Sequence, residues 1–176
     1  MEIDIQFVPS PPNLHLLSKQ VVVVIDILRA TSTMVHAMSQ GALEIIPVAT
    51  VEEAFQMAKV FHRSSIILGG ERESKKIPGF DLGNSPKEYS AERVRGKKLI
   101  LTTTNGTTAF HAVSSGKEIL AGSFLNIGAI AQRCLESNRD VFIFPSGDEG
   151  NFSLEDTLCG GMLIDLIIEK EKKQIS

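Results

Sequence analysis

Asp26 is the residue whose position most strongly suggests chemistry, because it directly follows the apolar run Val21–Ile25. A carboxylate at the end of a buried strand is costly unless a metal or a cation is its partner. Arg29, three residues later, carries a planar guanidinium that suits phosphate or sulfonate oxygens. Hydroxyls follow where a helix is expected to begin, and a helix N-terminus favours an anion. These hydroxyl residues are Thr31, Ser32 and Thr33.

This segment has a simpler alternative interpretation. Asp26 and Arg29 would pair with each other, and Thr31 would cap the helix. Caps of this kind surround many helices that bind nothing, so the segment does not establish a site alone.

Glu71 and Arg72 form a second candidate, because they follow two glycines at the end of a predicted strand. Glu71 could ligate a hard cation or carry a proton, and Arg72 could hold an anion. The polar connection continues to Pro86, and such a long loop in a compact domain is typical of a lid or binding loop. The alternative is a solvated surface loop whose charges bind no ligand.

A third polar turn contains Asn105, Gly106 and Thr107. Backbone amides around Gly106 and the hydroxyl of Thr107 could cradle a phosphate. The turn is not a Walker loop, because the Gly-Lys-Ser/Thr signature is missing. The alternative is a threonine-rich strand end with an ordinary helix cap.

A fourth polar turn precedes the last predicted helix and ends in Glu155 and Asp156. Glu155 could face the site from the first helical turn. The alternative is a capping box, because Asp156 follows Ser153 by three residues.

The elements that must position these turns are short β-branched runs alternating with amphipathic segments. The expected strands are Ile3–Val8, Gln20–Ile27, Leu43–Val48, Ser65–Leu68, Lys98–Leu101, Glu118–Ala121 and Asp140–Phe144. The expected helices are Thr31–Gln40, Val51–His62, Pro86–Val94, Asn105–Val113, Leu125–Glu136 and Leu154–Lys170. This order predicts a single α/β domain over residues 1–176, with a layered, mainly parallel sheet flanked by helices. In such folds ligands collect at the carboxyl ends of the strands, so the four polar turns are expected to converge there.

Composition narrows the classes of partner. The chain has 176 residues, a net charge of −3, 43% hydrophobic and 22% charged residues, which is an ordinary globular balance. It has no overall positive charge to gather nucleic acid or an acidic membrane surface. The N-terminus lacks a signal-peptide pattern, and no apolar run reaches the length of a membrane span. We therefore expect a cytoplasmic protein with a small anionic substrate and no nucleic-acid or membrane partner.

Three carboxylates in these turns are the expected metal ligands: Asp26, Glu71 and Glu155. Mg²⁺ prefers hard oxygen ligands and often shares its coordination sphere with substrate phosphate. The chain has no Gly-x-Ser-x-Gly elbow, Cys-x₅-Arg loop or dinucleotide fingerprint. The residues therefore indicate metal-assisted chemistry on a small phosphate-bearing molecule.

Five segments in order resemble the 2-phosphosulfolactate phosphatase family. They are Val23–Thr33, Gly69–Arg72, Gly79–Pro86, Thr102–Thr107 and Phe152–Gly161. The resemblance implies Mg²⁺-dependent hydrolysis of 2-phospho-3-sulfolactate to 3-sulfolactate and phosphate, a step towards coenzyme M. It also implies that a terminal strand and helix of the family are absent here, which would expose apolar surface and makes a homodimer an expectation.

The roles within the site follow from the same residues as a hypothesis. Asp26, Arg29 and Glu71 are the catalytic candidates, and Asp26 either binds Mg²⁺ or attacks phosphorus. Arg29 with the three hydroxyls after it should hold one anionic group, and Asn105, Gly106 and Thr107 should hold another with help from Arg72. Two alternatives stay open: a phosphatase or phosphotransferase acting on another small phosphorylated acid, and a non-catalytic anion-binding module.

Overall fold

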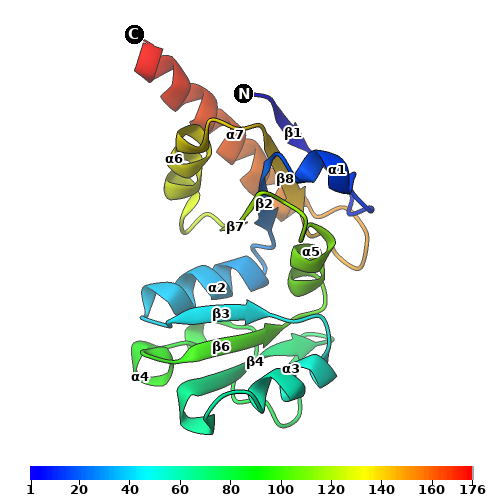
Figure 1. Cartoon of the computed structure of the whole chain (residues 1–176), viewed down its shortest axis with the longest axis vertical. Helices are drawn as coiled ribbons and strands as arrows, with labels where there is room; N and C mark the ends of the chain where they lie inside the picture. Colours follow the sequence, from blue (N-terminus) through cyan, green and yellow to red (C-terminus); the bar gives the residue numbers. More distant parts are fainter. Residues whose placement is uncertain (176) are drawn as a thin grey trace.

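The computed structural model describes residues 1–175, and the side chains of residues 1–172. The α/β class is confirmed, because helices alternate with mainly parallel strands along the chain. The described strands form two four-stranded sheets, called here sheet 1 and sheet 2. Figure 1 shows sheet 1 in the upper part of the molecule and sheet 2 in the lower part.

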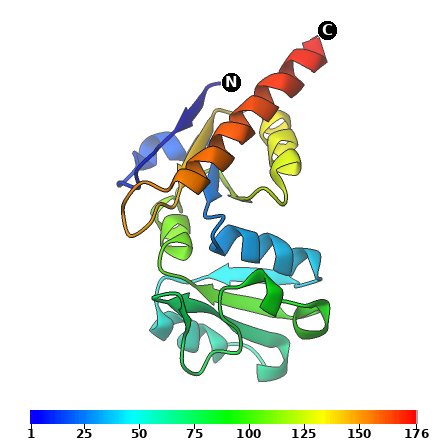
Figure 2. The ribbon, with the colours of Figure 1, turned by 180° about the vertical axis from the view of Figure 1, so that it is seen from behind.

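Sheet 1 contains the most hydrophobic strand and has the order β1-β8-β2-β7, with every pair parallel. Its strands are β1 (Ile3–Ile5), β2 (Val21–Ile25), β7 (Glu118–Gly122) and β8 (Val141–Pro145). All of β2 and β8 are buried, because helices cover both faces. One face packs on α6 (Ile127–Ser137) and α7 (Leu154–Ile175), which Figure 2 shows lying across the sheet. The other face packs on α1 (Leu14–Leu17) and α5 (Gly106–Ala112).

Sheet 2 has the order β3-β6-β4-β5, in which only the short β5 pairs antiparallel. Its strands are β3 (Glu44–Pro47), β4 (Ile66–Arg72), β5 (Lys75–Lys76) and β6 (Lys98–Thr102). One face packs on α2 (Ala30–Ser39) and α4 (Ala91–Val94), and the other on α3 (Val51–Ala58). Helix α2 lies between the two sheets and contacts strands of both (Figure 1).

Several local expectations differ from the structure. The sequence predicts a long polar loop after Leu68, but β4 runs on to Arg72 and a short turn leads into β5. The expected helix Pro86–Val94 is divided into a 3₁₀ turn, Pro86–Glu88, and α4. The short helix α1 was not predicted, because Pro9, Pro11 and Pro12 lie just before it and proline is typical of turns. The alternation of strands and helices predicted parallel pairing, but it does not say which strands become neighbours, so the division into two sheets was not foreseen.

Candidate active site

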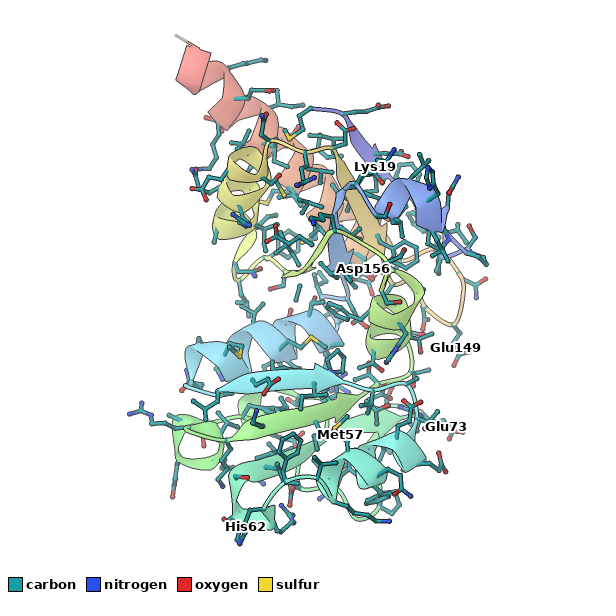
Figure 3. All side chains as sticks on the ribbon, viewed as in Figure 1. Lys19, Met57, His62, Glu73, Glu149 and Asp156 are labelled. Carbon is teal, nitrogen blue, oxygen red and sulfur yellow. The ribbon has the colours of Figure 1, made fainter. Side chains whose placement is uncertain are left out.

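A cleft of about 470 Å³ lies at the carboxyl ends of strands from both sheets. Sheet 1 contributes Asp26 after β2, with Arg29 in the same turn. Sheet 2 contributes Glu71 at the end of β4 and Asn105 after β6. Two of the cleft acids, Glu73 and Glu149, lie on the same side of the molecule in Figure 3, on turns from different sheets.

Asp26 lies where two helices begin. The residue is only 7% exposed, and its Oδ1 accepts a 3.0 Å hydrogen bond from the backbone amide of Ala30, the first residue of α2. Gly106, the first residue of α5, packs against it so closely that a Cβ there would lie 2.6 Å from Asp26 Oδ2. Burial raises the pKa of Asp26 above its usual value, although the Ala30 amide and the Ser146 hydroxyl oppose this. The nearby Glu71 carboxylate raises it further, so a bound cation would relieve a real electrostatic cost.

Glu71 is buried and is held in one orientation by the neighbouring loop. Its Oε1 accepts the backbone amide of Thr104 at 2.8 Å, and its Oε2 accepts the backbone amide of Ser74 at 2.9 Å. The Thr104 hydroxyl adds a longer contact of 3.3 Å to Oε2. Each carboxylate oxygen has two lone pairs, so Glu71 keeps acceptor capacity for a cation in the cleft.

The hydroxyl residues predicted to bind substrate are instead bonded to the backbone. Thr31 donates to the carbonyl oxygen of Asp26 at 2.8 Å, and Ser32 donates to that of Ile27 at 2.8 Å. Thr33 donates to the carbonyl oxygen of Asn84 at 3.2 Å, and Thr107 donates to that of Thr103 at 2.9 Å. These four hydroxyls shape the turns and do not line the cleft, so their contribution to substrate binding stays a prediction.

The two candidate arginines differ in availability. The Arg29 side chain lines the cleft, and its guanidinium makes no hydrogen bond or ion pair with the described residues, so the alternative of an Asp26–Arg29 pair is not realised. The Arg72 guanidinium is occupied, because it donates to the carbonyl oxygens of Glu71 and Ala49 and to the hydroxyl of Thr102. Arg29 is therefore the cleft cation that can meet an anion, and Arg72 holds the ends of β4 and β6 together.

On α7, it is Asp156 and not Glu155 that connects to the site. Glu155 is half-buried and does not line the cleft. Asp156 is 3% exposed, and its Oδ1 accepts the backbone amide of Ile27 at 2.8 Å, while the Ser146 hydroxyl donates to its Oδ2 at 3.3 Å. Burial raises the pKa of Asp156 to about 6, and the Asp26 charge adds to the rise. Ser153 caps α7 by accepting the Asp156 amide, but the reciprocal half of a capping box is replaced by these contacts.

The charge of the cleft argues for a bound cation. Its lining includes the carboxylates Asp26, Glu71, Glu73, Asp148 and Glu149, against the single guanidinium of Arg29. A substrate with several negative charges would be repelled unless a cation offset this surplus.

The described residues contain no group of three or more His, Cys, Asp or Glu side chains placed to hold a metal. Asn84, which lies in the segment Gly79–Pro86, also lines the cleft, and its buried Oδ1 has no hydrogen-bond partner among the described residues. Two buried carboxylates and a free amide oxygen fit a hard cation such as Mg²⁺.

Comparison with known proteins identifies the family. The family model described as 2-phosphosulpholactate phosphatase matches residues 7–176. The chain belongs to the 2-phosphosulfolactate phosphatase family. A probable 2-phosphosulfolactate phosphatase of Clostridium novyi is 44% identical over all 176 residues, which span 74% of that protein. A relative with the same description from Caldanaerobacter subterraneus is 49% identical over 149 residues, which are 85% of this chain and 62% of that protein.

A third relative in the family, a probable 2-phosphosulfolactate phosphatase of Carboxydothermus hydrogenoformans, is 43% identical over the whole chain and 71% of its own length. The resemblance seen in the five sequence segments is therefore confirmed at the level of the family. In the part of the chain that the structure describes, no helix is long and apolar enough to cross a membrane.

Proposed function

We propose that this chain is a Mg²⁺-dependent phosphatase that hydrolyses 2-phospho-3-sulfolactate to 3-sulfolactate and phosphate, and that it acts in the cytoplasm. The observation that carries the proposal is the meeting of two buried carboxylates, Asp26 and Glu71, with the unengaged guanidinium of Arg29 in one cleft. The names of its relatives support the same substrate.

We assign the residues of the cleft the following roles in binding the metal and the substrate. Asp26 and Glu71 would hold Mg²⁺, which supplies charge neutralisation for the phosphoryl group. Arg29 would bind anionic oxygens of the substrate through its planar fork, and the turn at Asn105, which also lines the cleft, would bind a second anionic group. The hydrogen bonds to Asp26 and Glu71 fix both carboxylates before substrate arrives, which lowers the cost of ordering them. Asp26 remains the candidate nucleophile if the phosphoryl group passes through a covalent intermediate.

Phosphate release from a panel of phosphorylated acids, with Mg²⁺ and with EDTA, tests the proposal. We expect 2-phospho-3-sulfolactate to give the highest kcat/KM and EDTA to stop turnover. Turnover of another phosphorylated acid at a higher kcat/KM would favour the alternative substrate class. Binding of the panel without turnover would make the chain a non-catalytic anion-binding module.

We also propose that the protein forms a homodimer. Leu154, Leu158 and Met162 recur every four residues on α7 and are 60%, 60% and 47% exposed, which makes an apolar stripe on one face of the helix. Light scattering of the purified chain should give twice the monomer mass, and Leu158→Lys should reduce it to the monomer value. A monomer at all concentrations would reject this proposal.

A further inference from the structure

Asn84 stands out among the described side chains because its Oδ1 is buried and has no hydrogen-bond partner. The residue is only 6% exposed and lines the cleft that contains Asp26 and Glu71. Leaving a buried acceptor unsatisfied is energetically costly, and native proteins rarely do so without a reason. A ligand that satisfies this oxygen in the cleft is such a reason.

The backbone around Asn84 is fixed by three hydrogen bonds, one from α2 and two from the 3₁₀ turn Pro86–Glu88 and the residue that follows it. Thr33 of α2 donates to the Asn84 carbonyl oxygen at 3.2 Å. The buried hydroxyl of Tyr89 donates to the preceding Gly83 carbonyl oxygen at 2.6 Å. The Glu88 carboxylate accepts the Gly83 amide at 2.9 Å. The amide side chain therefore projects from a rigid loop, although nothing in the described chain satisfies its oxygen.

The chemistry of this oxygen selects the ligand. An amide oxygen is an acceptor that carries partial negative charge, so it attracts a cation and repels the oxygens of a phosphate or sulfonate. Hard divalent cations take carboxylate and Asn carbonyl oxygens together. The described residues contain no group of three or more His, Cys, Asp or Glu side chains placed to hold a metal, so the Asn84 amide oxygen is the further ligand that we consider in this cleft.

We propose that Asn84 Oδ1 is the third protein ligand of the divalent cation held by Asp26 and Glu71. This inference rests on the Mg²⁺ dependence proposed above. The absence of charge on the Asn84 side chain also affects how strongly the metal site attracts the substrate phosphate. Two carboxylates balance the charge of Mg²⁺, whereas a third carboxylate would leave the metal site negative and weaken its attraction for phosphate.

Metal binding by the EDTA-treated protein tests the inference without any enzyme assay. The measurements are Mn²⁺ affinity from electron paramagnetic resonance and the rise in Tm caused by Mg²⁺. Asn84→Ala should weaken Mn²⁺ binding about tenfold or more and reduce the Mg²⁺-induced rise in Tm. The metal-free variant should be as stable as the wild type or more stable, because the buried Oδ1 that it loses has no hydrogen-bond partner.

Two further variants sharpen the test. Asn84→Asp should bind Mn²⁺ more tightly than the wild type, but should bind inorganic phosphate more weakly in the presence of saturating Mn²⁺. Asn105→Ala is the matched control, because Asn105 lines the same cleft but its Oδ1 already accepts the Glu149 amide. Its Mn²⁺ affinity should stay within about twofold of the wild type.

The outcomes separate this inference from the proposed function. Unchanged Mn²⁺ affinity in Asn84→Ala overturns the inference, whether or not the wild type hydrolyses 2-phospho-3-sulfolactate. Loss of metal-free stability with unchanged affinity overturns it too, since that result means a structural role. A wild type that binds Mn²⁺ through Asp26 and Asn84 but releases no phosphate supports the inference and rejects the phosphatase.

Discussion

At the scale of single residues, the surroundings of Asp26 favour the binding of a cation. The carboxylate is buried, its pKa is raised by that burial, and Glu71 lies close enough to raise it further. Backbone amides offset only part of this cost. A cation in the cleft would offset the remaining cost of burying the Asp26 charge. This is the physical reason to expect Mg²⁺ beside Asp26.

Changing Asp26 to Asn should therefore lower kcat by roughly 10³-fold or more, because the several kcal/mol that a cation contributes are lost. The free energy of unfolding of the metal-free protein should not fall, since the variant removes a buried charge. Steady-state phosphate release and urea denaturation check the two parts. Near-normal turnover by a folded Asp26→Asn variant would place the reaction elsewhere.

Arg29→Lys keeps the charge but loses the planar fork. We expect kcat/KM to fall about 10- to 100-fold, which corresponds to one lost charge-assisted hydrogen bond. Arg139→Lys on the exposed turn after α6 is the matched control and should leave kcat/KM unchanged. Equal effects of the two substitutions would mean that Arg29 contributes only general positive charge.

The sequence located part of this site and overlooked part of it. Asp26, Arg29, Glu71 and Asn105 were proposed from strand-end positions, and all four line the cleft. The hydroxyls after Arg29 were proposed on the same reasoning but bond to the backbone, because composition does not reveal which way a short side chain turns. Asn84 could not be singled out, since its only signal is a missing partner in three dimensions.

At the scale of elements, the site depends on how closely the beginnings of α2 and α5 approach each other. Gly106 opens α5, and a Cβ there would lie 2.3 Å from the Ala30 Cβ of α2. Sequence reasoning placed the start of α5 within one residue but read Gly106 as part of a phosphate cradle. The structure shows that only the absence of a side chain at Gly106 allows the two helices to meet, and its role in binding phosphate stays a prediction.

Gly106→Ala should consequently destabilise the protein by about 1–3 kcal/mol through overpacking. Gly128→Ala in α6 is the control, because a Cβ there meets nothing within 4 Å and Ala favours a helix. Urea denaturation should show a loss of stability for the first variant and none for the second. If both variants matched the wild type, the close approach of α2 and α5 would be wrong.

The first turn of α7 makes the stability of the metal-free protein depend on pH. The pKa of Asp156 is raised from 3.8 to about 6, so the folded state binds this proton more tightly than the unfolded state. Its contribution to stability is therefore fully present below about pH 4 and is lost as the pH rises through about 6.

Asp156→Asn tests this contribution, because the amide keeps an acceptor for the Ile27 backbone amide but does not ionise. In EDTA, the free energy of unfolding of the wild type minus that of the variant should decrease by about 3 kcal/mol at most between pH 4 and pH 6.5. A difference that stays constant with pH would show that Asp156 has an ordinary pKa.

At the scale of the whole molecule, the cleft belongs to neither sheet alone. Asp26 follows a strand of sheet 1, whereas Glu71 and Asn105 follow strands of sheet 2. The α/β class and the gathering of polar turns at strand ends followed from the sequence pattern. The division into two sheets did not, because local periodicity carries no information on which strands pair across long separations. The single domain over residues 1–176 stays a prediction.

A crystal structure of the protein with Mn²⁺ and inorganic phosphate tests the central claim most directly, because the anomalous signal of Mn²⁺ locates the metal. The account predicts one strong anomalous peak in direct contact with carboxylate oxygens of Asp26 and Glu71, with phosphate between that peak and the Arg29 guanidinium. A peak bound elsewhere, with Asp26 and Glu71 making no contact to metal, would contradict it.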